Sequence, residues 1–400
     1  MNKSIQAQIL KLIYVMLAGT IFFQILSVHT LSSLFFYATM FLTMFLAISR
    51  AKEKWTQYDK LAILIAFVSI IAVLIDSALY KNQPSLSDYT KFVSFLLCIF
   101  YFATLSALKF DKKTIDFVLQ VNTFIAITFV GNYVLRRSDV YIFRGIITNY
   151  LTFRFTNPNL ASLFLLCCTI GELIHVCRKK TLSARIIHAL LAAILTWFIY
   201  ETDSRNALLS ISFFLVFVFC QLAFRRTFRM SRRVAAMISI FPFLFFVVYM
   251  LTINKTKALK LFNFLISSGK ALNSRVSVWK YAWTVFSDSP IIGSFMHTLA
   301  LTQLHNSHID ILASYGGIVF PFFCLFLYYI LLSASANAKT KASRLAVWGF
   351  AAILIAGVGE AAFFSGGLGI YAYAGIPLLI ANESWEDSLN ETNSSSCFLS

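Results

Sequence analysis

Long apolar segments separated by short polar segments make up most of this sequence. A helix needs about 20 mainly apolar residues to cross the hydrocarbon core of a bilayer, and on that measure the pattern predicts about twelve membrane helices. The expected helices cover residues 10–28, 31–49, 61–80, 92–109, 114–135, 158–177, 186–200, 207–224, 234–253, 307–335, 345–362 and 367–382. The tenth of these is unusually long, so a break is expected at Gly316-Gly317.

The composition supports a membrane protein rather than a soluble one. The chain has 400 residues, of which 59% are hydrophobic and 13% charged, whereas soluble domains are about 25% charged. We therefore expect an all-α, polytopic membrane protein with a single transmembrane domain over 1–382. The Ser- and Asn-rich segment 383–400 is expected to be a disordered cytoplasmic tail.

Short basic clusters occur in alternate loops and predict the orientation of the helices. The positive-inside rule places such loops, and with them both termini, in the cytoplasm. These loops contain Arg50 to Lys60, Lys109 to Lys113, Arg178 to Arg185, Arg225 to Arg233 and Lys339 to Arg344. The net charge of +17 arises from these loops rather than from a continuous basic face, so no nucleic-acid partner is expected.

The opposite loops are expected outside the cytoplasm: 81–91, 136–157, 201–206, 254–306 and a small turn near Phe364-Ser365-Gly366. The loop 254–306 is the longest. Within it, apolar residues recur at helical spacing from Val276 to Phe286, which predicts an amphipathic helix lying on the bilayer.

Neither cysteine nor histidine spacing predicts a metal site. Five of the seven cysteines lie inside apolar segments, without metal-binding spacing or a disulfide framework, and are expected to be buried thiols. His305 and His308 are three residues apart and would share a face of a helix, but only Asp310 is near enough in sequence to add a third ligand. No metal is therefore expected there.

Three arginines in the outer loops are not explained by the positive-inside rule: Arg154, Arg205 and Arg275. Each has an ordinary interpretation as a headgroup anchor at the membrane surface. Their planar guanidinium groups would also suit a diphosphate, which they can bind through two parallel hydrogen bonds. A neutral histidine such as His305 beside them could remove a proton from an attacking hydroxyl.

Acidic residues near helix ends are further candidates. Asp76, Glu172 and Glu360 fall at or inside apolar segments, where ionisable groups are often functional. Each of them could instead pair with a neighbouring side chain.

Five short motifs follow one another along the chain: Phe155-Thr156-Asn157-Pro158-Asn159, Thr202-Asp203-Ser204-Arg205-Asn206-Ala207, Ser274-Arg275 with Trp279, Pro290-Ile291-Ile292-Gly293, and His305-Asn306 with Gly316. In this order they resemble the O-antigen ligase and polymerase superfamily of bacterial envelopes, and the long outer loop after the ninth helix resembles its ligase branch. Val319 departs from the ligase pattern, which has Gly, Thr or Tyr at that position.

The resemblance implies a glycosyltransferase of the bacterial inner membrane whose active face is periplasmic. Such a ligase moves a glycan from undecaprenyl diphosphate to the outer sugar of lipid A–core, without metal or cofactor. By resemblance, Arg205 and Arg275 would hold the diphosphate, and His305 would act as the catalytic base or position the acceptor. Four further residues are expected to contact substrate: Lys91, Arg154, Asn306 and His308.

Two other functions remain open from the sequence. A polymerase that joins repeat units on the same lipid carrier would use the same donor, although polymerases tend to have two large outer loops. A secondary transporter would depend on midplane residues such as Asp76 or Glu360 rather than on the outer arginines and His305.

Overall fold

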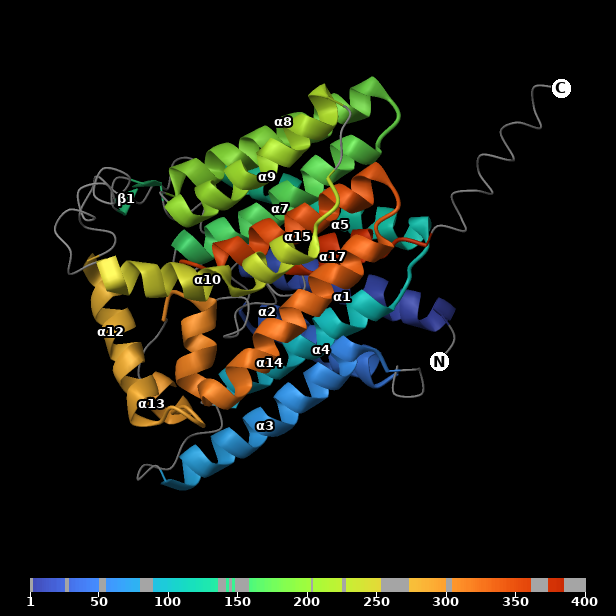
Figure 1. The fold of residues 1–400 in the computed structure, drawn as a ribbon. Coiled ribbons are helices and arrows are strands. Elements are labelled where there is room, and N and C mark those ends of the chain that lie inside the picture. The colour runs from blue at the N-terminus through green and yellow to red at the C-terminus, as the bar shows by residue number, and fades with distance from the viewer. Residues whose placement is uncertain are drawn as a thin grey trace.

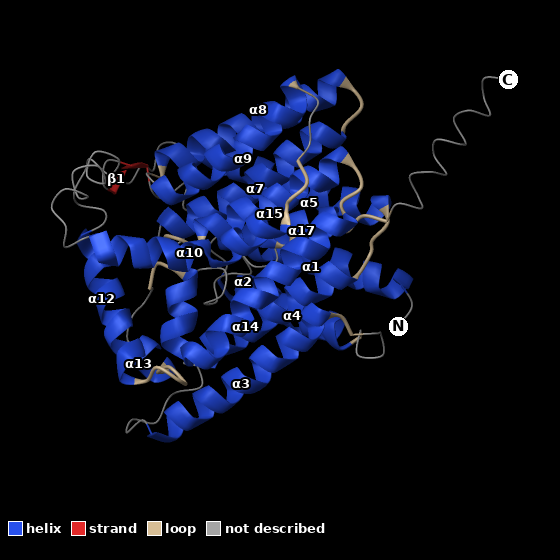
Figure 2. Ribbon diagram, in the orientation of Figure 1, coloured by secondary structure: helices blue, strands red, loops and turns tan. Residues whose placement is uncertain are grey.

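The computed structural model describes residues 3–25, 29–49, 55–79, 89–135, 142–143, 146–147, 158–202, 204–224, 228–252, 273–299, 304–360 and 373–384. Nearly all of them are helical, and the described strands form one antiparallel pair (Figures 1 and 2). The elements are α1 (Lys3–Ile25), α2 (His29–Ile48), α3 (Gln57–Leu79), α4 (Thr90–Ala107), α5 (Lys112–Leu135), β1 (Ile142–Phe143), β2 (Ile146–Ile147), α7 (Pro158–Arg178), α8 (Leu182–Glu201), α9 (Arg205–Ala223), α10 (Arg232–Thr252), α12 (Asn273–Asp288), α13 (Phe295–Leu299), α14 (Ser307–Asn337), α15 (Lys341–Ala356) and α17 (Ile376–Ala381).

The protein is an all-α polytopic membrane protein, as the sequence predicts. Within the described residues, 10 helices are long and apolar enough to cross a membrane. They correspond to the first ten expected helices. The eleventh, α15, has 16 residues, and the described part of the twelfth is α17 with 6 residues, so the expected count of twelve is not confirmed.

Large apolar side chains cover the outside of the bundle as well as its interior. Phe41 on α2 is 69% exposed and Leu79 on α3 is 76% exposed. A helix that is apolar all round is typical of a membrane span, because lipid and protein both accept apolar side chains. In contrast, every residue of α15 from Leu345 to Ala356 is buried, and so are all six residues of α17. These two helices therefore form the centre of the bundle, where α15 packs against α7, α9 and α17.

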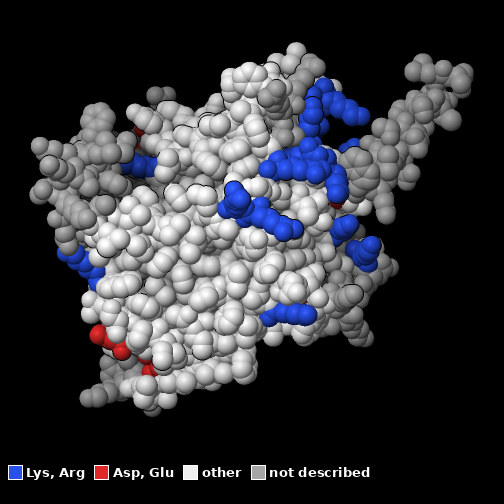
Figure 3. All heavy atoms as spheres, in the orientation of Figure 1, with Lys and Arg blue, Asp and Glu red and all other residues white. Residues whose placement is uncertain are grey.

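Basic residues gather at the end of the bundle where α1 begins and α7 ends (Figure 3). Here α7, α9 and α14 end and α8, α10 and α15 begin, and the connections expose basic side chains. These are Lys180, Arg185, Arg229, Arg232, Arg233, Lys339 and Lys341. The opposite end carries α12 and α13 (Figure 1). The charge asymmetry expected from the sequence is thus present in three dimensions.

The amphipathic helix predicted in the long outer loop forms as α12, but its apolar face packs on protein. Trp279 is 1% exposed, and its ring lies edge-on to Phe246 and Tyr249 of α10, with centroids 5.7 and 5.4 Å away. The expectation that this face lies on the bilayer is therefore wrong for Trp279. Its indole is large enough to fill the space beside α10, and burial against aromatic rings is favourable.

The first two residues of the tail predicted over 383–400 pack against the helices. Arg178 at the end of α7 donates to both oxygens of Glu383, at 2.6 and 2.9 Å, and also to Asp116 of α5 at 2.9 Å. The amide of Ser384 donates to the carbonyl of Phe110. Glu383 and Ser384 therefore belong to the folded bundle. The rest of the expected tail, 385–400, lies outside the described residues.

Candidate functional site at the α14 N-terminus

Asn306 organises the start of α14. Its side-chain oxygen accepts hydrogen bonds from the amides of His308 and Ile309, at 3.0 and 3.1 Å, which satisfies two of the amides left unpaired at a helix N-terminus. Its side-chain nitrogen donates to the carbonyls of Pro242 and Val358, at 3.0 and 3.1 Å. One buried amide thus joins α14 to α10 and to the residues that follow α15.

His308 supports the same junction from inside the helix. It is 1% exposed, and its Nε2 donates to the carbonyl of Ser239 at 2.7 Å. Pro242 lies inside α10 and has no amide proton, so the helical hydrogen-bond pattern is interrupted close to Ser239. We expected His308 to contact substrate. Its burial against α10 argues for a structural role instead.

His305 lies just before the helix rather than on it, so the expectation that His305 and His308 share a helical face is wrong. Among described residues other than glycine, His305 alone has a positive φ, of 51°. Such a conformation costs about 1–3 kcal/mol and persists where the surroundings hold it. The indole nitrogen of Trp279 donates to the carbonyl of Leu304 at 3.0 Å, which holds the residue before His305.

The ring of His305 faces a buried carboxylate. Its Nδ1 lies 3.4 Å from Oε2 of Glu360, whose side chain is 2% exposed, while the side chain of His305 is 24% exposed. A carboxylate at Nδ1 favours the tautomer in which Nε2 carries a lone pair. The pair therefore resembles the base-and-orienter arrangement of enzymes that activate a hydroxyl.

Residues 356–360, which we call the α15 end segment, gather several site residues. The side-chain amide of Asn206 donates to the carbonyl of Ala356. The amide of Ser307 donates to the carbonyl of Gly357 at 2.9 Å, and its hydroxyl to the carbonyl of Glu360 at 2.8 Å. Because Asn206 follows Arg205 directly, the start of α9 and the start of α14 meet on one segment.

The loop motif Pro290-Ile291-Ile292-Gly293 docks into the predicted break of α14. Gly316 has φ 76° and ψ 179°, so the break at this glycine is confirmed. Amides of Gly317 and Ile318 donate to the carbonyls of Pro290 and Ile291, at 2.8 and 3.1 Å. A methyl group on Gly316 would overlap the Ile291 carbonyl, so the chains approach this closely only because residue 316 is glycine.

Asp76 anchors the next residues of the same loop. Its carboxylate accepts from the hydroxyl of Ser294 at 3.0 Å and from the amide of Met296 at 2.7 Å. Both oxygens of this carboxylate therefore accept hydrogen bonds from the loop. Asp76 therefore fits a loop anchor better than the midplane site that a transporter would need.

Lys91, at the start of α4, is paired with Asp310 in the first turn of α14. Its Nζ lies 2.7 Å from Oδ1, and the side chains are 17% and 3% exposed. Because the charge of Asp310 offsets that of Lys91, the pair attracts an anion less strongly than an unpaired lysine would. Lys91 and Asp310 are 219 residues apart, and no local pattern in the sequence links them.

Of the three arginines expected at the site, the structure describes the side chain of one, Arg205. Arg205 is exposed at the first turn of α9. Arg275 lies in the first turn of α12, one helical turn before Trp279, and only its backbone is described. Arg154 lies outside the described residues. The structure thus connects His305 with Glu360 and brings the start of α9 to the same segment.

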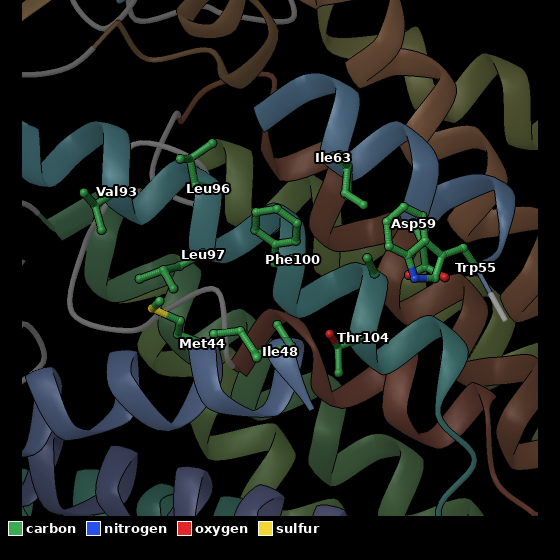
Figure 4. A pocket seen from close by; sticks show the side chains of 13 residues that line it. Met44, Ile48, Trp55, Asp59, Ile63, Val93, Leu96, Leu97, Phe100 and Thr104 are labelled. Carbon is green, nitrogen blue, oxygen red and sulfur yellow. The ribbon is translucent and has the colours of Figure 1, made fainter. Parts of the chain in front are cut away.

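An apolar cavity of about 400 Å³ lies between α2, α3 and α4 (Figure 4). On α4 the lining residues extend from Val93, two residues after Lys91, to Thr104. Several lining side chains lie on the outside of the bundle, among them Met44 and Ile48. Such a recess can accept a hydrocarbon chain from the surrounding lipid.

A scan against models of known protein families finds no match, and a search of curated proteins finds none either.

Proposed function

We propose that this protein is a glycosyltransferase that moves a glycan from undecaprenyl diphosphate to the outer sugar of lipid A–core, the reaction of O-antigen ligases. The observation that carries the proposal is the ordered, partly exposed His305 beside buried Glu360, at the end of the bundle that also presents Arg205. The motifs that resemble the ligase family supply the substrate class.

Three of the motifs make contacts that support His305 and the helix after it. Asn306 caps α14 directly after it, and Trp279 binds the carbonyl directly before it. The Pro290–Gly293 turn is bound into the break at Gly316. A catalytic group needs its geometry fixed to a fraction of an ångström, and these contacts provide that support.

The transfer itself needs a base and positive charge. The acceptor hydroxyl gives its proton to Nε2 of His305, and its oxygen forms a bond to the anomeric carbon of the donor sugar. The bond from that carbon to the phosphate oxygen breaks, and undecaprenyl diphosphate leaves with the electron pair. Arg205 and Arg275 would neutralise the charge that develops on it. Glu360 holds the imidazole and stabilises the imidazolium that forms.

The membrane setting suits a lipid-linked donor. By the positive-inside rule, the basic end faces the cytoplasm, and His305 then faces the periplasm of a bacterial inner membrane. No ATP is available there, so the energy of transfer comes from the donor's phosphate bond. The apolar cavity between α2, α3 and α4 offers a recess for part of the isoprenoid chain.

Complementation tests the proposal. The gene is expressed in Gram-negative cells that lack their own ligase, and lipopolysaccharide is resolved on a gel. Wild type is expected to restore O-antigen-bearing lipopolysaccharide, while His305→Ala, Glu360→Gln and Arg275→Ala accumulate undecaprenyl-linked glycan. The matched control is Lys280→Ala, which removes an exposed side chain from α12. Membrane abundance is measured for every variant.

Two results would overturn the ligase assignment. Lipid-linked glycan that stays at one repeat without the protein and lengthens with it would identify a polymerase. Full activity of His305→Ala and Arg275→Ala together would remove the proposed site, whatever the reaction.

A further inference from the structure

A second cluster of ionisable residues lies at the opposite end of the bundle. It consists of Glu172 and His175 on α7 and His188 on α8, which are 0%, 1% and 8% exposed. One ligand atom from each of the three lies within 4.8 Å of the others. His188 is about 20 Å along α8 from Glu201, where the chain turns toward Arg205, so this cluster is separate from the proposed catalytic site.

The contacts of Glu172 orient its carboxylate. Oε2 lies 2.7 Å from Nδ1 of His188. Oε1 accepts from the side-chain amide of Asn122 and from the hydroxyl of Thr123, both at 2.8 Å and both from α5. In metal sites, neighbouring residues commonly donate hydrogen bonds to a ligating carboxylate and so fix its orientation.

The two imidazoles are stacked, with ring centroids 3.9 Å apart and planes at 30°. Two protonated imidazoles would repel each other at this distance. A neutral imidazole instead has a nitrogen lone pair, and this is the form of histidine that binds metal ions. The stacking therefore favours at least one neutral histidine next to a buried carboxylate.

Two buried polar atoms of the cluster have no hydrogen-bond partner within the described residues: Nε2 of His175 and Oδ1 of Asn122. Such atoms in folded proteins are usually satisfied by ordered water or by an ion. The position of Asn122 is also enforced by packing. A methyl group on Gly171 would come within 2.7 Å of its side-chain nitrogen, so this glycine makes room for the amide.

We propose that Glu172, His175 and His188 form a binding site for a divalent transition-metal ion, with Zn²⁺ as the best fit. Two imidazole nitrogens and one carboxylate oxygen are a common zinc ligand set, and a fourth position remains for water. Imidazole ligands disfavour Mg²⁺ and Ca²⁺, which prefer oxygen. The ion would balance the buried charge of Glu172 and join α7 to α8, with α5 supporting it through Asn122 and Thr123.

The site lies close to the helix ends on the basic side of the bundle. His175 lies three residues before the end of α7 at Arg178, and His188 six residues after the start of α8 at Leu182. The ligands are therefore about 5–9 Å from the helix ends. Arg178 binds Asp116 and Glu383 next to this site, so metal and ion pairs would together hold the same end of the bundle.

Zinc binding to the full-length protein tests the proposal. The protein is purified in detergent without a histidine tag, stripped with a chelator, mixed with Zn²⁺ and desalted, and bound zinc is measured by elemental analysis. Wild type is expected to retain about one Zn²⁺ per chain and to unfold at a higher temperature with zinc than without it. Cobalt in place of zinc should give the visible absorption of a tetrahedral site.

Matched variants identify the ligands. His175→Ala, His188→Ala and Glu172→Gln are expected to weaken zinc binding by more than about 100-fold, and Asn122→Ala by about 10–100-fold. His297→Ala, an exposed histidine, should bind zinc as wild type does. If His188→Ala does not fold, His175→Ala remains informative, because the hydrogen bond that its ring makes, to Thr123, is long at 3.4 Å.

Either of two results would overturn the proposal. In the first, folded wild type retains no zinc, and the cluster is then a histidine–carboxylate ion pair alone. In the second, His175→Ala and His188→Ala retain as much zinc as wild type, and the bound ion then lies elsewhere.

Discussion

Replacing Gly316 with alanine should release the loop motif from the break in α14. Gly316 has φ 76° and ψ 179°, a region of backbone conformation that is essentially restricted to glycine. A methyl group there would overlap the carbonyl of Ile291 and would lie 2.5 Å from the amide nitrogen of Gly293. The neighbouring atoms are backbone, so they cannot move aside as a flexible side chain would.

The expected cost follows from the conformation and the hydrogen bonds. The strained backbone adds about 1–3 kcal/mol, and the bonds from Gly317 to Pro290 and from Ile318 to Ile291 contribute about 0.5–1.5 kcal/mol each. Gly316→Ala should therefore destabilise the protein by about 2–6 kcal/mol, a large share of a typical 5–15 kcal/mol. It should also lower glycan transfer, because the loop from Pro290 leads to His305.

Thermal unfolding of purified protein in detergent measures the first effect, and the complementation assay the second. Gly131→Ala is the matched control, because a methyl group there meets nothing within 4 Å and alanine is a better helix former than glycine. Gly131→Ala should be as stable as wild type or slightly more stable. Wild-type stability and transfer in Gly316→Ala would show that the loop does not depend on this break, and the reasoning would fail.

Three further predictions concern single contacts. Lys91→Met leaves the carboxylate of Asp310 buried and unpaired, so it should cost about 3–5 kcal/mol, and the double variant with Asp310→Asn should cost less. A double-mutant cycle by thermal unfolding measures these stabilities. An equal loss of stability in Lys91→Met and in the double variant would contradict the prediction. Asn306→Ala should lose about 2–4 kcal/mol, and Asn306→Asp should not recover it, because a carboxylate would face the carbonyls of Pro242 and Val358. Full stability of Asn306→Asp would mean that helix capping alone matters. Trp279→Phe keeps the packing on α10 but loses the bond to Leu304, so stability should fall by about 1 kcal/mol and transfer by up to about 100-fold. Unchanged transfer, measured with stability in the same preparation, would separate Trp279 from the site.

The sequence predicted the helices well because their signal is local. Apolar segments of membrane-spanning length identified ten spans, and two adjacent glycines in a long segment located the break at Gly316. The helical spacing from Val276 to Phe286 predicted α12. The same spacing could not say whether its apolar face meets lipid or protein, and the contact of Trp279 with α10 decided that.

The site was predicted less completely because its contacts join distant parts of the chain. His305 and Glu360 are 55 residues apart, and Lys91 and Asp310 are 219 apart. Glu360 stood out in the sequence as an acid beside an apolar segment, but nothing local linked it to His305. His305 and His308 looked equivalent by spacing. The cap at Asn306 separates them, leaving one exposed and the other buried.

The most direct test of the central claim is glycan transfer by purified protein in a lipid nanodisc, with a defined undecaprenyl-diphosphate-linked glycan and lipid A–core. Wild type and Lys280→Ala should transfer glycan at the same rate, and His305→Ala should be slower by about 10²–10⁴-fold, the usual contribution of a general base. Transfer by folded His305→Ala at the wild-type rate would contradict the account.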